Sequence, residues 1–272
     1  MTGGSFDWEP LLREGPLFLG ILNLTPDSFS DGGHFADPGA ALAQARQLVA
    51  SGAGMLDLGA ESTRPGAAPL DPEVEWARLG PVLTALRAAL PGVPLSLDTR
   101  HAAVAARGLA GGIAVLNDVT GFGDPGMLSL ARDTGCGLIA MRSRVQDGAL
   151  VMPPYDDASP RTAAAALAEL RTVRDRLDRA GIPPARTLLD PGFGFGTTYR
   201  EDLALWEALA GLPGELAWPA ERVCIGISRK RFLAFRNATP GLPPADRDAL
   251  TAAAHAEARG LGYRVFRTHA AL

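Results

Sequence analysis

Polar side chains that can do chemistry follow the short apolar runs of this chain, at the point where each run ends. If these runs are parallel strands, their carboxyl ends meet at one edge and the polar groups gather there. Carboxylates and amides in such a group can read the donor edge of a heterocycle, and basic groups can hold an anion. Any one residue could be only a strand-end hydrogen bond, but the set predicts a binding site. Its members are Asn23, Glu61, Asp98, Asn117, Met141, Asp190, Ser228, Lys230, Arg267 and His269.

The basic residues of the chain single out Lys230. It is the only lysine among 26 basic residues, and the other 25 are arginine. A codon bias toward alanine and arginine would explain the general replacement of lysine. A lysine that survives such a bias indicates a position where a compact ammonium fits and a planar guanidinium does not, because the two groups differ in shape and in donor geometry.

Eight apolar runs alternate with stretches of helical period, which predicts parallel strands joined by crossover helices. Eight strands and seven helices in 272 residues predict one (β/α)8 TIM-barrel domain over 1–272, with an N-terminal extension at 1–16. A doubly wound open sheet is the alternative, but no glycine-rich dinucleotide turn follows the first run. The strands are expected at 17–23, 55–61, 94–99, 113–118, 136–141, 187–192, 223–228 and 263–269, and the helices at 40–52, 71–90, 102–111, 125–135, 160–181, 200–212 and 244–262.

No eighth helix follows the last predicted strand, so one side of the barrel needs another cover. We expect the segment 1–16, a second copy of the chain, or residues beyond this sequence to provide it. Two glycine-rich segments after the first two strands, 25–38 and 62–72, are long enough to be mobile active-site loops.

Composition excludes several classes of protein. A formal charge of −4 provides no basic surface for nucleic acid. No apolar run approaches the roughly 20 residues of a membrane span, and no secretory signal is recognisable, so we expect a cytoplasmic protein. Cys136 and Cys224 lie inside apolar runs and are expected to be buried free thiols.

Seven segments between residues 20 and 269 resemble, in order and spacing, the signature segments of the dihydropteroate synthases. They are GILNLTPDSFSDGG (20–33), ESTRPGA (61–67), SLDT (96–99), LNDV (116–119), DPGFGFG (190–196), SRKRF (228–232) and RTH (267–269). The resemblance implies condensation of 6-hydroxymethyl-7,8-dihydropterin pyrophosphate with p-aminobenzoate, which yields 7,8-dihydropteroate and pyrophosphate for folate synthesis. It also implies a homodimer and binding of sulfonamides, which mimic p-aminobenzoate.

The same resemblance implies a role for each matching residue. The catalytic set would be Asn23, Asp98, Lys230, Arg267 and His269. The pterin would be bound by Asp98, Asn117, Met141, Asp190, Lys230 and Arg267. Pyrophosphate would be bound by Asn23, Thr63, Arg267 and His269, with Asn23 also binding a Mg²⁺ carried by the substrate. The p-aminobenzoate slot would be formed by Phe29, Thr63, Arg64, Pro65, Phe195, Ser228 and Arg231.

The chain departs from the family pattern at two places inside the motifs. Thr197 stands where a lysine usually follows DPGFGFG, and we expect Arg200 to reach back in its place. The segment that usually reads His-Met-Gln-Gly is Ala140-Met141-Arg142-Ser143. Two alternatives therefore stay open, a non-catalytic paralogue and a pterin-binding barrel of the methyltransferase type. The loop, SRK and RTH segments favour the synthase, because they supply the pyrophosphate and arylcarboxylate contacts.

Overall fold

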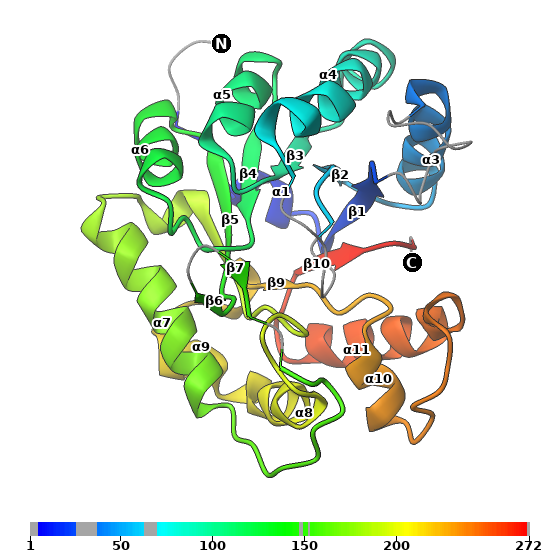
Figure 1. The fold of residues 1–272 in the computed structure, drawn as a ribbon, viewed down its shortest axis with the longest axis vertical. Helices are drawn as coiled ribbons and strands as arrows, with labels where there is room; N and C mark the ends of the chain where they lie inside the picture. The colour runs from blue at the N-terminus through cyan, green and yellow to red at the C-terminus, as the bar shows by residue number, and fades with distance from the viewer. Residues whose placement is uncertain (1–4, 26–36, 63–69, 147–148, 152, 271–272) are drawn as a thin grey trace.

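Eight parallel strands form a barrel in the computed structural model of the protein, which describes residues 5–25, 37–62, 70–146, 149–151 and 153–270 (Figure 1). The strands hydrogen-bond in the order β8-β5-β4-β3-β2-β1-β10-β9, and a bridge between Leu189 and Val223 joins the two ends of the sheet. The predicted TIM barrel is confirmed and the open sheet is excluded. The barrel strands are β1 (Leu17–Asn23), β2 (Met55–Gly59), β3 (Leu95–Asp98), β4 (Val115–Asp118), β5 (Gly137–Met141), β8 (Thr187–Asp190), β9 (Cys224–Ile225) and β10 (Val265–Thr268).

Helices surround the barrel on its outer face (Figure 1). Three of them begin at an Asp-Pro pair: Asp37, Asp71 and Asp124 each accept a backbone N–H of the first turn, which satisfies donors that the helix leaves unpaired. The helices are α3 (Pro38–Ala50), α4 (Pro72–Ala89), α5 (Ala102–Ala110), α6 (Pro125–Thr134), α7 (Ala164–Arg179), α8 (Tyr199–Glu207), α9 (Leu212–Leu216), α10 (Arg231–Arg236) and α11 (Asp248–Gly260).

The sequence analysis did not predict all the connections around the barrel. The short helix α10 follows β9 directly, and its six residues are too few to show a helical period. A hairpin of β6 (Val145–Gln146) and β7 (Ala149–Leu150) interrupts the connection between β5 and α7. The helix predicted at 200–212 is observed as α8 followed by a 3₁₀ turn at Ala208–Ala210, and α9, which begins at Leu212, was not predicted.

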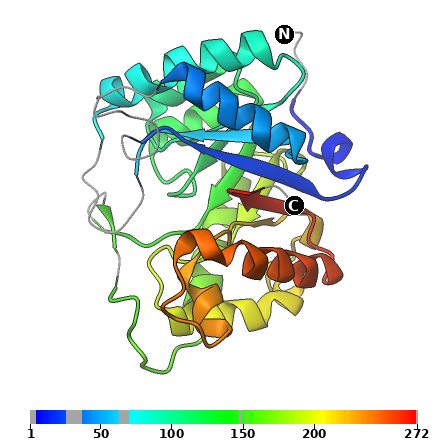
Figure 2. The same ribbon diagram turned by 90° about the vertical axis from the view of Figure 1, so that its right-hand side faces the viewer.

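The amino-terminal helix α1 (Glu9–Leu12) closes the end of the barrel where the strands begin (Figure 2). Trp8 is fully buried among the first inward side chains of the strands. Its indole N–H donates to the carbonyl of Arg186 at 2.8 Å. The described part of 1–16 therefore covers this end and not the side beside β10, for which it was one of the three covers considered. On that side Phe18 stacks on Phe266, with ring centroids 5.6 Å apart.

Both cysteines are buried and free, as predicted. None of the helices in the described part of the chain has the length and apolar character to cross a membrane.

Candidate active site at the carboxyl ends of the strands

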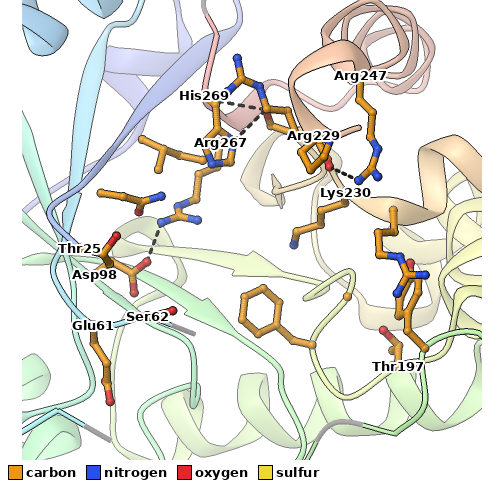
Figure 3. Close-up of a pocket in the computed structure, with 18 of the residues that line it drawn as sticks. Thr25, Glu61, Ser62, Asp98, Thr197, Arg229, Lys230, Arg247, Arg267 and His269 are labelled. Carbon is orange, nitrogen blue, oxygen red and sulfur yellow. Dashed lines mark hydrogen bonds and ion pairs between the residues drawn. The ribbon is translucent and has the colours of Figure 1, made fainter. Parts of the chain in front are cut away.

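A cavity of about 720 Å³ opens at the carboxyl ends of the barrel strands. Its wall contains most of the side chains that the sequence analysis singled out, and Figure 3 shows Lys230 and Arg267 extending into it. Strand alternation places Arg267 on the inward face of β10, and His269, directly after the strand, continues on the same side. The predicted site residues that line the cavity are Asn23, Glu61, Asp98, Phe195, Ser228, Lys230, Arg231, Arg267 and His269.

Arg267 is held by two carboxylates from neighbouring strands. Its Nε lies 2.6 Å from Oδ2 of Asp57, and its Nη2 lies 2.6 Å from Oδ2 of Asp98. Burial opposes the positive charge, but the two carboxylates outweigh burial and raise the pKa of Arg267. The guanidinium is therefore a permanent cation in the centre of the cavity.

The carboxyl group of Asp98 titrates close to neutral pH. Burial raises the pKa of Asp98 to about 7, Arg267 opposes this shift, and the nearby carboxylates of Asp57, Glu75 and Asp118 add to it. Asp98 can consequently accept hydrogen bonds as an anion above this pH and donates one as an acid below it.

Lys230 reaches across the cavity from the segment after β9. Its ammonium donates to the carbonyl of Phe193 and lies 4.6 Å from the ring centroid of Phe195. Burial lowers the pKa of Lys230 to about 8, although Asp190 and Asp202 both favour the charged form. The only lysine of the chain is thus a cation that can lose its proton in mildly alkaline solution.

These two groups predict a bell-shaped pH profile for the reaction at this site. We expect kcat/KM for the pterin pyrophosphate that the family resemblance implies to fall below about pH 7, where Asp98 becomes protonated. We also expect it to fall above about pH 8, where Lys230 loses its charge. Steady-state measurement of kcat/KM from about pH 5.5 to about pH 9.5 tests both the acid and the alkaline fall. Asp98→Asn should abolish the acid limb only; an unchanged acid limb in that variant contradicts the assignment.

Asp190, Asn117 and Met141 lie deeper in the barrel and are not part of the cavity wall. Oδ1 of Asp190 accepts the backbone N–H of Gly192 at 2.7 Å, and burial raises the pKa of Asp190 while Lys230 opposes the shift. Gly192 has a φ of +66°, and a Cβ there would meet the carbonyl oxygen of Arg142 at 2.1 Å, so only glycine fits this turn.

His269 faces the cavity as a neutral imidazole. Burial, together with the charges of Arg267, Arg229 and Lys230, lowers its pKa to about 4. The hydroxyl of Ser228 accepts the backbone N–H of His269 at 3.0 Å and lies 3.2 Å from its Nδ1. When Ser228 donates to Nδ1, the ring proton is on Nε2. Ser228 thus orients His269, and its hydroxyl is already engaged within the protein.

Several predicted residues lie outside the described part of the chain. These are Phe29, Thr63, Arg64 and Pro65, together with most of the predicted loops 25–38 and 62–72. The described ends of the second loop are connected, because the Glu61 carboxylate accepts the backbone N–H of Leu70 at 3.1 Å and pairs with Arg100 at 2.8 Å.

Thr197, which replaces the usual lysine, has a structural task here. Its hydroxyl donates to Oδ1 of the buried Asp202 at 2.7 Å. The other oxygen of Asp202 accepts from the hydroxyl of Tyr155 at 2.8 Å, and Tyr155 lines the cavity. Arg200, expected to compensate for the missing lysine, instead lies over the ring of Tyr199 at 5.1 Å and is not part of the cavity wall.

Arg142, the second departure, holds the turn that follows β8. Its buried guanidinium donates to the carbonyls of Pro191 and Gly192, both at 2.8 Å, and pairs with Glu169 at 2.9 Å. The arginine thereby fixes the turn that carries the backbone donor to Asp190.

Removal of this guanidinium should destabilise the protein. We expect Arg142→Met to lower the free energy of unfolding by about 2–4 kcal/mol, because two buried carbonyls lose their donor. Arg132→Met is the matched control: the Arg132 side chain is 54% exposed and pairs with Asp133 at the surface, so its loss should leave the free energy of unfolding nearly unchanged. Urea denaturation measures both variants, and equal losses would refute the role of Arg142.

The sequence analysis missed several residues of the site. Asp57 lies in the middle of the apolar run MLDLG, and a charged residue inside a buried strand was the signal that could have identified it. Tyr155 comes from the long connection after β5, where no periodicity marked it. The other unpredicted residues on the wall are Ile21, Thr25, Gln44, Ser62, Pro153, Gly194, Thr197, Pro244 and Arg247.

The chain is similar to known proteins over nearly its whole length. The family model of the pterin binding enzymes matches residues 19–269. A dihydropteroate synthase of Neisseria meningitidis serogroup C is 39% identical over 259 residues, which cover 93% of this chain and 87% of that protein. The type-2 dihydropteroate synthase of Escherichia coli is 39% identical over 262 residues, which cover 95% of this chain and 92% of that protein.

Solved structures show the same similarity. The Xanthomonas albilineans dihydropteroate synthase with 4-aminobenzoic acid has a TM-score of 0.81 and 34% identity, covering 98% of this chain and 93% of that chain. The dihydropteroate synthase of Thermus thermophilus in complex with 6HMPPP has a TM-score of 0.74 and 38% identity, covering 94% of this chain and 89% of that chain.

Proposed function

The chain belongs to the dihydropteroate synthases, a family of pterin-binding enzymes, and we propose how its own residues divide the work of that reaction. The enzyme condenses 6-hydroxymethyl-7,8-dihydropterin pyrophosphate with p-aminobenzoate, giving 7,8-dihydropteroate and pyrophosphate. The observation that supports our assignment is the convergence of Asp98, Lys230 and Arg267 on one cavity from three separate strand ends.

The pterin ring binds between Asp190 and Asn117, which lie deep in the barrel, and the two cations Lys230 and Arg267. Asp190 and Asn117 read the 2-amino-4-oxo edge of the ring, because a carboxylate accepts two parallel N–H donors at once. The ammonium of Lys230 donates to the O4 and N5 side. The guanidinium plane of Arg267 lies along the ring face, and Met141 packs against the ring from below.

The pyrophosphate leaves toward Arg267, Asn23 and His269. Arg267 supplies a permanent charge, and neutral His269 supplies an N–H donor that needs no protonation. Departing negative charge is stabilised where donors are already oriented and water is scarce. The reaction begins with loss of pyrophosphate, which leaves cationic character on the pterin methylene. The amine nitrogen of p-aminobenzoate then attacks that carbon, so no nucleophilic side chain is required.

A substrate-borne Mg²⁺ fits the donor set of this mouth. Asn23 lines the cavity and presents an amide oxygen, a ligand type that magnesium accepts. The described residues also contain no cluster of three or more His, Cys, Asp or Glu that could form a metal cage. Magnesium keeps several waters and takes few protein ligands, so a single amide oxygen suits it. When bound, Mg²⁺ would neutralise pyrophosphate oxygens.

Loss of this amide should therefore change the metal requirement. We expect Asn23→Ala to raise the Mg²⁺ concentration needed for half-maximal activity about tenfold, which corresponds to the loss of one charge-assisted contact. The KM for p-aminobenzoate should stay within about twofold, a change too small to correspond to a lost hydrogen bond. Titration of activity with Mg²⁺ measures both, and an unchanged half-maximal concentration removes Asn23 from the metal site.

The p-aminobenzoate slot opens toward the rim of the cavity. Phe195 and Arg231 border it, with Tyr155 stacked below the Arg231 guanidinium at 4.9 Å from the ring centroid. Arg231 also pairs with Asp156 at 2.5 Å, and 47% of the Arg231 side chain is exposed. A benzoate carboxylate would exchange this surface contact for one of its own. Phe29, Thr63, Arg64 and Pro65 are proposed for the same slot by family resemblance.

One assay tests the proposed function directly. The protein is incubated with the pterin pyrophosphate, Mg²⁺ and p-aminobenzoate, while pyrophosphate release and dihydropteroate are followed together. Stoichiometric appearance of both products is expected. Tight binding of the pterin pyrophosphate without product would instead identify a non-catalytic pterin-binding barrel.

We also propose a homodimer and a cytoplasmic location. Free, buried thiols are compatible with a reducing compartment. Light scattering of the purified protein measures its mass in solution, and a value near one chain would refute the dimer.

A further inference from the structure

A fully buried carboxylate lies beneath the cavity and touches two of its functional side chains. Asp57 on β2 is 0% exposed and is not part of the cavity wall. Its Oδ2 accepts from Nε of Arg267 at 2.6 Å and from Nδ2 of Asn117 at 3.0 Å. One oxygen atom thus joins side chains from β10 and β4, on opposite sides of β2 and β3 in the sheet order.

We propose that Asp57 is the positioning residue of the pterin site, setting the orientation of Arg267 and Asn117 together without touching the substrate. This inference rests on the roles proposed above for Arg267 and Asn117. It adds a residue for which the signature motifs carried no role, because Asp57 lies between the segments 20–33 and 61–67.

The cost of burying Asp57 supports a functional reason for its presence. A buried carboxylate is expensive unless its partners compensate fully. Its second oxygen, Oδ1, has no hydrogen-bond partner among the described residues, and neither has the buried hydroxyl of Ser96, its register neighbour on β3. The hydrogen bonds of Asp57 therefore offset only part of the desolvation cost of its carboxylate, and an apolar residue at this position would cost less free energy. The presence of a carboxylate here is best explained by the contacts of its Oδ2 with Arg267 and Asn117.

The two carboxylates on Arg267 have different tasks. Asp98 lines the cavity, so a ligand can compete for it, whereas Asp57 is closed off from ligand. If Asp98 turns to the pterin, Arg267 keeps its contact to Asp57 and its orientation. A guanidinium anchored only by Asp98 would lose its anchor at the moment of binding.

The test is the substitution Asp57→Asn, which keeps the side-chain shape and one oxygen acceptor but removes the charge. We expect the dissociation constant for the pterin pyrophosphate, measured by calorimetry without p-aminobenzoate, to rise about tenfold or more, since hydrogen bonds to charged groups exceed neutral ones. The KM for p-aminobenzoate should change by less than about twofold, since that slot is bordered by other residues. Asp57→Ala, which also removes the acceptor, should weaken pterin binding further.

A pH profile separates positioning from general destabilisation. Asp98 is faced by Arg267 from β10, Asp57 from β2, Glu75 from α4 and Asp118 from β4. Without the charge of Asp57, the guanidinium acts on Asp98 alone, so the acid limb of kcat/KM should move below about pH 7 in Asp57→Asn. A loss of stability by itself would leave the limb in place.

Glu201→Gln is the matched control for removal of a buried negative charge. Glu201 is 2% exposed and pairs with Arg144 outside the cavity wall. This variant should lose stability but keep the pterin dissociation constant and the acid limb. Wild-type affinity and an unmoved limb in Asp57→Asn would overturn the inference while the active wild-type enzyme still supports the proposed function. An inactive wild-type enzyme would instead refute the proposed function.

Discussion

Replacing Asp190 with asparagine should lower the affinity for the pterin pyrophosphate by about 100-fold or more. The pterin edge presents two N–H donors, and each charge-assisted hydrogen bond to a carboxylate contributes about 1.5–3 kcal/mol. Asparagine offers one acceptor, and its NH₂ group would face a donor of the ligand. Since Oδ1 of Asp190 already accepts the backbone N–H of Gly192 at 2.7 Å, the amide oxygen would stay on that side and turn the NH₂ group toward the pterin.

Asp118→Asn is the control for this experiment. Asp118 is also fully buried and also accepts backbone N–H groups, those of Thr120 at 2.7 Å and Phe122 at 3.0 Å. Unlike Asp190, it has both oxygens engaged, Oδ1 by Thr120 and Oδ2 by Phe122. We expect this variant to lose stability in thermal unfolding and to bind the pterin pyrophosphate as the wild type does. Asp190→Asn with wild-type affinity in calorimetry would remove Asp190 from the pterin site.

Lys230→Arg should bind the pterin pyrophosphate about 10- to 100-fold more weakly, although the positive charge is retained. The ammonium fits between the carbonyl of Phe193 and the ring of Phe195. A guanidinium is wider and needs coplanar partners. Because arginine stays protonated, the variant should also lose the fall in kcat/KM above about pH 8.

The reverse exchange on the neighbouring helix is a suitable control. Arg236 on α10 is 32% exposed and pairs with Glu257 at 2.7 Å. Arg236→Lys should leave pterin affinity unchanged, since this pair lies outside the cavity wall. Undiminished affinity in Lys230→Arg would show that charge alone, and not the shape of the ammonium, is what the site requires.

The barrel and most of the cavity wall could be predicted from local patterns. Each of the eight predicted strand ranges contains a strand of the barrel. Once the strands are parallel and closed, the residues at their carboxyl ends must meet, so Asp98, Ser228, Arg267 and His269 fall on one cavity. Composition also identified Lys230 as a candidate site residue, because it is the only lysine beside 25 arginines.

The hydrogen bonds between side chains within the site could not be predicted from local sequence patterns. Asp57 bonds to Asn117 and Arg267, which are 60 and 210 residues away along the chain, and such contacts depend on strand register and on which face each side chain takes. The same holds for Thr197, whose hydroxyl bonds to Asp202, and for Arg200, which turned to Tyr199.

The sequence by itself determined the fold and the kind of chemistry, since apolar periodicity and strand-end residue types are local properties. Only the tertiary structure decided the protonation and the partners of the site. Burial raises the pKa of Asp98 to about 7 and lowers that of Lys230 to about 8, and burial exists only when distant segments pack together. The division of Arg267 between Asp57 and Asp98 arises for the same reason, because three strands must close into the barrel before their charges meet.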